Sequence, residues 1–267
     1  MSEAAPPQFR IVIPARLGST RLPRKVLRTL AGKPLVQWTW EAARAVVGPM
    51  TMPDAAPDAV IIATDDAEVR AACAAFGADV QMTDPAHQSG TDRVNEIATA
   101  AGWPDDTIVV NLQGDEPLMP AAMVLEAAQL LARDATADIA TLCHPLHDHR
   151  DWLNPNVVKV VMAANGHALY FSRAPIPWKR EGTSPTSPLP AGLAFRHIGL
   201  YAYRVGALRR FSGLPVSSLE QCEALEQLRA LEAGLRIRVG ISAVPPPRGV
   251  DTEADLEAVA AVLESRA

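Results

Sequence analysis

The stretch FRIVIPARLGSTRLPRK, residues 9–25, decides the fold of this 267-residue chain and gives the first indication of its function. Its first six residues are an apolar run rich in β-branched side chains, which is typical of a strand buried on both faces of a parallel sheet. A loop follows directly after Pro14. Because ligands of open α/β sheets bind beyond the carboxyl ends of the strands, this loop is a candidate site.

The alternation of strand and helix signals extends this stretch into a fold. Two further apolar runs, DAVIIAT at 58–64 and TIVVNLQ at 107–113, predict buried strands of the same kind. Segments with helical spacing follow the strands, and the predicted helices cover residues 34–46, 65–76, 90–101 and 120–134. This order predicts an α/β fold, a Rossmann-like, mainly parallel sheet with helices on both faces.

The second half of the chain is less regular. Asn165-Gly166 is a strong hairpin signal, so residues 157–162 and 167–173 are predicted to pair as antiparallel strands. The alternating segment FRHIGLYAYR, 195–204, predicts another strand. The remaining predicted elements are one helix over 218–234, a strand over 236–242 and a closing helix over 252–266.

The domain organisation follows from what separates these elements. No linker divides the chain and no internal repeat is visible, so we expect one domain, 1–267, with an inserted antiparallel lobe at about 140–205. Two stretches rich in proline and small residues, 48–58 and 179–192, predict flexible loops.

Composition limits the classes of function. The formal net charge of -5 argues against a broad nucleic-acid surface. No apolar run reaches the ~18 residues of a membrane-spanning helix, and the N-terminal MSEAAPPQFR lacks the apolar core of a signal peptide. Cys73, Cys143 and Cys222 are too far apart for a zinc motif, and we expect reduced thiols. The sequence therefore predicts a cytoplasmic protein that binds neither nucleic acid nor membrane.

The loop after Pro14 is unusually basic for an acidic chain. Six lysines and arginines, and no acid, lie between residues 16 and 33. The loop contains no G-x-G-x-x-G, and Gly32-Lys33 is followed by proline rather than serine or threonine, so it is neither a Rossmann nor a Walker motif. A solvated basic surface loop is one interpretation. The position at a strand end favours the other, an anion site.

A triphosphate fits the chemistry of this loop. A turn at 18–20, Gly-Ser-Thr, can direct backbone N–H groups toward an anion. Arg16, Arg21 and Lys25 can balance the charge of a triphosphate, whereas Arg28 is expected to lie outside the contact.

Two later motifs supply acids at predicted strand ends. Asp115, in QGDEP, follows the strand at 107–113, and Asp251, in GVDT, precedes the last helix. Mg²⁺ commonly takes one or two protein carboxylates, with water and phosphate oxygens completing its shell, so both aspartates are candidate ligands. Each also has a structural alternative, because aspartate is common in turns and at helix N-caps. The segment HQSGTDR, 87–93, could contact a base through its small residues and backbone N–H groups, or it could cap a helix. Taken alone, it favours the cap.

At this point the motifs resemble those of a known family. Between about Phe9 and Glu264 the sequence is similar to the CMP-Kdo synthetases, the 3-deoxy-manno-octulosonate cytidylyltransferases, which are sugar nucleotidyltransferases. The basic motif alone is shared with CMP-sialate synthetases and other sugar nucleotidyltransferases, and the combination is more specific. The matching motifs are IPARLGSTRLPRK, GKPL, ATDD, HQSGTDR, NLQGDEP, NPNVVKVV, ALYFSRAPIPW, RHIGLYAYR, LEQCEALEQLR and GVDTEADL.

The resemblance implies a reaction and a set of site residues. CTP and Kdo would give CMP-Kdo and pyrophosphate for lipopolysaccharide biosynthesis, with Mg²⁺ as cofactor, in a cytoplasmic homodimer. Catalytic roles would fall to Arg16, Lys25, Asp115 and Asp251, the two aspartates being the Mg²⁺ ligands. Nucleotide binding would involve Pro14, Ala15, Arg16, Arg21, Lys25, Ser89, Arg93 and Asp115. Sugar binding would involve Gln113, Arg173, His197, Tyr201, Glu226 and Gln227.

The implied sugar site makes chemical sense. Arg173 can hold the carboxylate of Kdo by a two-pronged pair, and His197 and Tyr201 lie on one face of the same strand. Glu226 and Gln227 can hydrogen-bond to sugar hydroxyls. In isolation these residues have ordinary alternatives: half-buried sheet residues for the two aromatic rings, a solvated helix residue for Glu226 and a surface cation for Arg173.

The sequence departs from the family pattern at Arg24, where the family usually has glycine, and in the loops 48–58 and 179–192. Two other functions stay open. One keeps the chemistry and changes the sugar, as in a CMP-sialate-like or amino-Kdo cytidylyltransferase. The other is a non-catalytic nucleotide-binding protein on the same fold.

Overall fold

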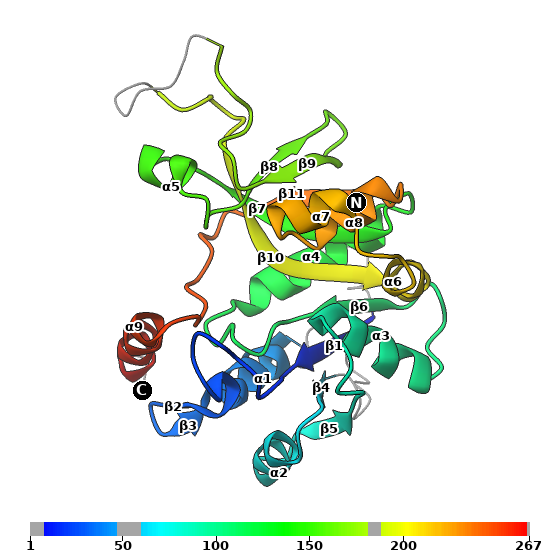
Figure 1. Ribbon diagram of the computed structural model, residues 1–267, viewed down its shortest axis with the longest axis vertical. Helices are drawn as coiled ribbons and strands as arrows, with labels where there is room; N and C mark the ends of the chain where they lie inside the picture. The colour runs from blue at the N-terminus through cyan, green and yellow to red at the C-terminus, as the bar shows by residue number, and fades with distance from the viewer. Residues whose placement is uncertain (1–7, 47–59, 181–187, 266–267) are drawn as a thin grey trace, which may run out of the picture.

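The computed structural model of the protein describes residues 8–46, 60–180 and 188–265. The predicted loop 48–58 lies outside the described residues, as does the central part of the predicted loop 179–192. Among the described residues, nine strands form one large sheet that runs through the molecule (Figure 1). Seven of them lie in the order β11-β7-β10-β6-β1-β4-β5, and β8 and β9 extend the sheet from β10.

The three predicted parallel strands and a fourth that was not predicted, β5, form one half of this sheet. β1 (Phe9–Pro14) lies between β6 (Ile108–Asn111) and β4 (Val60–Thr64), and β5 (Asp79–Met82) follows at the edge. All four run parallel. The mainly parallel sheet expected from the apolar runs is therefore confirmed, and the carboxyl ends of β1 and β6 lie at one edge.

The other half of the sheet contains a strand, β10, that runs in the opposite direction to its neighbours. β10 (Phe195–Arg204) is antiparallel to β6 on one side and to β7 (Ile139–Pro145) on the other, and β7 pairs in parallel with β11 (Ile237–Ile241). The pairing of β10 with β7 shifts register between Ile198 and Tyr201. This irregularity breaks the alternation of side chains that the sequence of the strand predicts.

The predicted hairpin is present beside β10. β8 (Lys159–Met162) and β9 (Ala168–Ser172) are antiparallel, and Gly166 in the connecting turn has φ 78°, a left-handed conformation that favours glycine. With α5 (His149–Leu153), the hairpin projects at the end of the molecule far from α9 in Figure 1.

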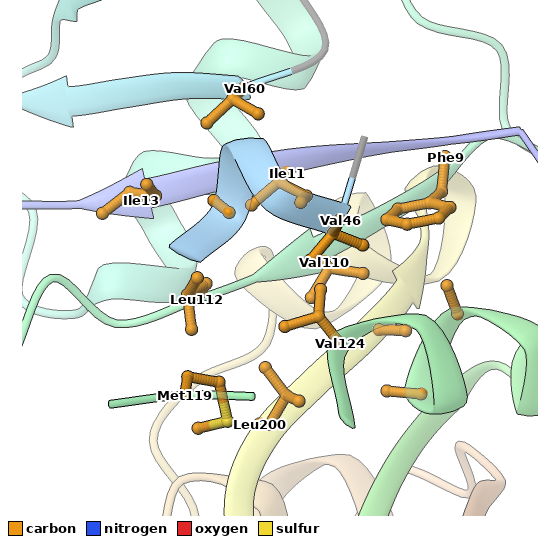
Figure 2. Close-up of a cluster of buried hydrophobic side chains, with 14 of the residues drawn as sticks. Phe9, Ile11, Ile13, Val46, Val60, Val110, Leu112, Met119, Val124 and Leu200 are labelled. Carbon is orange, nitrogen blue, oxygen red and sulfur yellow. The ribbon is translucent and has the colours of Figure 1, made fainter. Parts of the chain in front are cut away.

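Helices cover both faces of the sheet, which explains why the strands are apolar throughout. α1 (Leu35–Val46), α2 (Ala67–Ala75) and α4 (Ala121–Arg133) pack on one face, and α3 (Gly90–Ala100) and α6 (Val205–Ser212) on the other. Figure 2 shows Phe9, Ile11 and Ile13 of β1 in the first of these cores, whereas Val12 belongs to the second.

The single helix predicted over 218–234 is wrong. The chain forms two short helices, α7 (Ser218–Glu223) and α8 (Gln227–Glu232), because Ala224 turns into the left-handed region at φ 50°. Nothing in the local sequence signals this break. It coincides with contacts from elsewhere: the Arg173 side chain donates to the carbonyl oxygens of Glu223 and Ala224, at 2.6 and 3.2 Å. The break leaves Glu226 at the start of α8.

The closing helix packs against the basic loop. α9 (Glu253–Glu264) shares an apolar cluster with the short hairpin of β2 (Thr29–Leu30) and β3 (Lys33–Pro34), which follows the 3₁₀ turn η1 (Lys25–Leu27). Thr252 is the N-cap of α9 and forms a capping box with Asp255. Among the described residues, no helix has the length and apolar character needed to cross a membrane.

Candidate active site

A cavity of about 310 Å³ opens at the carboxyl ends of β1 and β6, and we call it the loop cavity. The turn at 18–20 and the N-terminus of α3 form much of its wall. Most of the predicted phosphate and nucleotide residues line it, although they come from four separate parts of the chain. The predicted residues in its wall are Pro14, Arg16, Arg21, Lys25, Ser89, Arg93, Gln113, Asp115 and Asp251.

Ala15 is the exception among the predicted nucleotide-binding residues. It is fully buried in the core, and its N–H donates to the carbonyl of Ala63 at 2.8 Å. A Cβ on Gly114 would lie 2.9 Å from the carbonyl oxygen of Pro14, so glycine is needed where the QGDEP turn crosses β1. Ala15 therefore lies beneath the cavity, packed between Ala63 and Gly114, and is not part of the cavity wall.

Lys25 joins the two predicted metal ligands. Its Nζ lies 2.5 Å from Oδ2 of Asp115 and 3.1 Å from Oδ1 of Asp251, and only 12% of its side chain is exposed. Burial lowers the pKa of Lys25, but the two carboxylates outweigh it and the net pKa is raised. Arg21 adds a second contact to Asp251 at 3.0 Å. A charged ammonium therefore holds both carboxylates at one point of the wall.

The six cations of the basic loop divide into two sets of three. Arg16, Arg21 and Lys25 line the cavity, as predicted. The other three pair with acids elsewhere: Arg28 with Glu253 at 3.0 Å, Lys33 with Glu41 at 2.7 Å, and Arg24 with Glu68. Arg28, which is expected to lie outside the contact with the triphosphate, is not in the wall of the loop cavity.

The structure explains why glycine suits the position of Arg24. Its backbone lies in the left-handed region at φ 59° and ψ 30°, which L side chains adopt at a cost. Its guanidinium turns toward Glu68 of α2 and is not in the wall of the loop cavity. The Arg24 side chain therefore forms a surface ion pair and does not obstruct the loop cavity.

The HQSGTDR segment at the N-terminus of α3 both caps the helix and lines the loop cavity. Ser89 is the N-cap and forms a capping box with Asp92, and it also lines the loop cavity. Arg93 is 3% exposed, pairs with Asp65 at 2.7 Å and donates to Oγ1 of Thr83 at 2.7 Å. Arg93 thus holds the ends of β4 and β5 together behind the wall that it helps to form.

A second cavity, of about 330 Å³, lies beside β10, and we call it the β10 cavity. Gln113 lines both this cavity and the loop cavity. A larger space of about 550 Å³, the bridging cavity, shares Asp115 and Asp251 with the loop cavity and Arg196 and His197 with the β10 cavity. The predicted sugar residues in the wall of the β10 cavity are Gln113, His197, Tyr201, Glu226 and Gln227.

Two of the rings on β10 are uncharged at pH 7: that of His197, which is buried, and that of Tyr201, which is partly buried. Burial, helped by the charge of Arg196, lowers the pKa of His197 to about 3, so its imidazole is neutral at pH 7. Its Nε2 lies 3.0 Å from Oγ1 of Thr141, and its ring is 5.4 Å from that of Tyr201. Burial raises the pKa of Tyr201, which keeps its hydroxyl protonated as a hydrogen-bond donor.

Arg173 is the predicted sugar residue that the structure does not bring to these walls. Its guanidinium donates to three backbone carbonyls, of Glu223 at 2.6 Å, Pro155 at 3.0 Å and Ala224 at 3.2 Å. Sequence analysis had treated it as a carboxylate ligand or a surface cation. In the structure it ties the end of α7 to the lobe.

Sequence reasoning missed several charged residues of the walls, and two of them, Arg196 and Glu116, bear on the site. Arg196 lines both the bridging and the β10 cavity, and its signal was its place in RHIGLYAYR beside His197. Glu116, the second acid of QGDEP, lines the bridging cavity, and burial together with the charges of Asp115 and Asp251 raises its pKa to about 8.

The wall of the loop cavity holds three cations of the basic loop and two carboxylates at the carboxyl edge of an α/β sheet, a set that is typical of proteins that bind phosphorylated substrates. The chain belongs to the cytidylyltransferase family, whose sequence model matches residues 10–237. It is 49% identical over 259 residues to a 3-deoxy-manno-octulosonate cytidylyltransferase of Pseudomonas syringae pv. tomato, covering 96% of this chain and 98% of the relative. The same name, identity and coverage apply to a relative from Cellvibrio japonicus.

Solved structures agree with this assignment. A CMP:2-keto-3-deoxy-manno-octonic acid synthetase complexed with CTP aligns over 98% of this chain and 100% of its own, with a TM-score of 0.84 and 40% identity. A cytidylyltransferase from Leptospira borgpetersenii shares the fold, with a TM-score of 0.60 at 13% identity, over 96% of this chain and 87% of its own.

Proposed function

We propose that this protein transfers CMP from CTP to the anomeric hydroxyl of Kdo, giving CMP-Kdo and pyrophosphate. The observation that carries the proposal is the joining of Asp115 and Asp251 by Lys25 in the wall of the loop cavity. The names of the relatives, and the CTP bound by one of the similar structures, supply the nucleotide and the sugar.

The loop cavity would take the triphosphate. Arg16, Arg21 and Lys25 offer positive charge along one wall, and the turn at 18–20 offers backbone N–H groups. Transfer of this kind depends mainly on positioning and on neutralising the charge that develops on the phosphates. These residues can supply both, because the fold holds them in place before substrate arrives.

The donor set suits Mg²⁺, which we propose as the cofactor. Asp115 and Asp251 would hold it, since both carboxylates meet at a single ammonium and therefore lie close together. Among the described residues, no group of three or more His, Cys, Asp or Glu is arranged to hold a metal. Two carboxylates suffice for Mg²⁺ when phosphate oxygens and water complete its shell. When bound, the ion would polarise the α-phosphate and offset its charge.

The β10 cavity would take the sugar. His197 and Tyr201 offer neutral hydrogen-bonding groups, and Glu226 and Gln227 offer acceptors and a donor for hydroxyls. Arg196, which lines this wall, would hold the carboxylate of Kdo by charge. Gln113 lies in both walls, so the two substrates would meet there.

The protein would act as a homodimer through the lobe at about 140–205. Four large apolar side chains of the lobe are exposed: Leu153, Leu169, Trp178 and Leu193. A second copy of the chain would cover them. Size-exclusion chromatography with light scattering measures the mass of the protein in solution. A monomer at micromolar concentration would contradict this part of the proposal.

Release of pyrophosphate tests the function directly. Purified protein is incubated with CTP, Mg²⁺ and a panel of 2-keto acid sugars that contains Kdo, an amino-Kdo and a sialic acid. We expect fastest release with Kdo and none without sugar. Preference for sialate or the amino sugar would reassign the substrate, and absence of release with every sugar would leave only a nucleotide-binding role.

A further inference from the structure

Glu226 lines the β10 cavity, and each of its carboxylate oxygens has a partner. Its Oε2 accepts a hydrogen bond from the Thr91 hydroxyl at 2.9 Å, and Thr91 belongs to the first turn of α3. Its Oε1 lies 3.2 Å from Nη2 of Arg229, one turn further along α8. Because Ser89 at the start of α3 lines the loop cavity, Glu226 connects that helix to the β10 cavity.

Arg229 is buried and makes several contacts around Glu226. The residue is 8% exposed, its Nε lies 3.1 Å from the Glu220 carboxylate, and its Nη1 donates to the carbonyl of Leu214 at 3.1 Å. Its guanidinium also stacks over the Phe211 ring at 4.4 Å. These contacts leave its side chain little freedom to move, so it presents one fixed edge to Glu226.

We propose that Arg229 is a positioning residue that holds Glu226 charged and in one orientation, so that the carboxylate accepts hydrogen bonds from hydroxyls of the bound sugar. This inference rests on the proposed function for its substrate and concerns a residue outside the cavity walls.

The charge of Glu226 depends on its neighbours. Burial raises its pKa, and the hydrogen bonds from Thr91 and Ser89 and the charge of Arg229 oppose that rise. Asp92 of α3 raises it further, and the other ionisable groups near it, Tyr201 and Tyr203 of β10, have pKa values raised by burial and stay neutral. Arg229 is thus the cation that stabilises the charged form. Without it, a protonated Glu226 would offer one acceptor fewer to a sugar hydroxyl.

Two measurements on Arg229→Met test the proposal. The pKa of Glu226, followed by carbon NMR on labelled protein with Glu226→Gln to assign the signal, should rise by roughly one unit or more. The KM for Kdo should rise on the order of tenfold, whereas the KM for CTP should stay within about twofold. In a Glu226→Gln background, Arg229→Met should raise the KM for Kdo no further, because its partner is already gone.

Glu220→Gln is the matched control, because it removes the charge of the other carboxylate on Arg229 and keeps the α7 capping box. It should leave the KM for Kdo unchanged. Arg229→Lys retains a charge and should give a smaller rise in KM, and it replaces Arg229→Met if that variant does not fold.

An unchanged pKa of Glu226, or effects of Arg229→Met and Glu226→Gln on the KM for Kdo that simply multiply, would overturn the proposal. The NMR titration needs no turnover. A wild-type protein that is inactive with Kdo therefore contradicts the proposed function without deciding the role of Arg229.

Discussion

The Lys25 ammonium lies 2.5 Å from the Asp115 carboxylate, although 90 residues separate the two in the chain. The same ammonium reaches Asp251, 226 residues away, at 3.1 Å. One side chain of the basic loop thereby fixes the separation of two acids that arrive from different ends of the fold.

Asp115→Asn should remove turnover and keep the fold. The change preserves the shape of the side chain and deletes the charge that faces Lys25, so we expect pyrophosphate release to fall at least ~100-fold. The midpoint of urea unfolding should move little, because Lys25 retains Asp251. Glu253→Gln is the control: it breaks the pair with Arg28 outside the cavity and should leave release within about twofold. Retained turnover in Asp115→Asn would refute the metal assignment.

Arg196 and Arg173 should respond differently to the same substitution. Arg196→Met removes a cation from the β10 cavity and should raise the KM for Kdo roughly tenfold or more, with little effect on the KM for CTP. Arg173→Met instead leaves three carbonyls without their donor and should cost about 2–4 kcal/mol of folding free energy. Steady-state kinetics and urea unfolding on both variants separate the two roles. A rise in the KM for Kdo confined to Arg173→Met would restore Arg173 as the carboxylate ligand.

The pH dependence of folding should report on His197. The imidazole stays neutral in the fold down to pH about 3, whereas in the unfolded chain it takes up a proton below about 6.5. The unfolded state therefore binds more protons between these values, and the contribution of His197 to stability falls as the pH falls. Between pH 7 and 5 the wild type should lose about 2 kcal/mol relative to His197→Asn in urea unfolding. Equal losses in the two proteins would show that His197 titrates normally.

Arg24 offers a test of backbone conformation. Arg24→Gly and Arg24→Ala both lose the pair with Glu68, but only glycine adopts the left-handed backbone without a steric cost. The glycine variant should therefore melt roughly 2–4 °C above the alanine variant in calorimetry. Equal melting temperatures would mean that the loop relaxes to accommodate alanine.

The parts of this protein that could be predicted from sequence are those that local pattern determines. β1 is buried on both faces, so all of its residues except Arg10 are apolar. The loop that follows it lies at the carboxyl end of a strand, where α/β sheets bind their ligands. Arg16 and Asp115 lie within a few residues of such strand ends, and Lys25 lies further along the same loop as Arg16. Their positions could therefore be predicted before the fold was seen.

Long-range contacts account for what was missed. The break at Ala224 follows from contacts with Arg173, about fifty residues earlier in the chain, and no local residue announces it. The register shift in β10 depends on its pairing with β7, so alternation alone could not show that Arg196 and His197 share cavity walls. The residues around the β10 cavity therefore depend more on tertiary contacts, and were harder to predict from sequence, than the residues around the loop cavity.

The pairing of the basic loop with the segment before α9 has a consequence for biosynthesis. Arg21 and Asp251 are 230 residues apart, so a growing chain carries its exposed cations through most of translation before their counter-charges leave the ribosome. Until then the nascent polypeptide has a positive arm and no carboxylate from its C-terminal segment to neutralise it. Catalytic competence would therefore wait until the segment that carries Asp251 has been made and α9 packs on the loop.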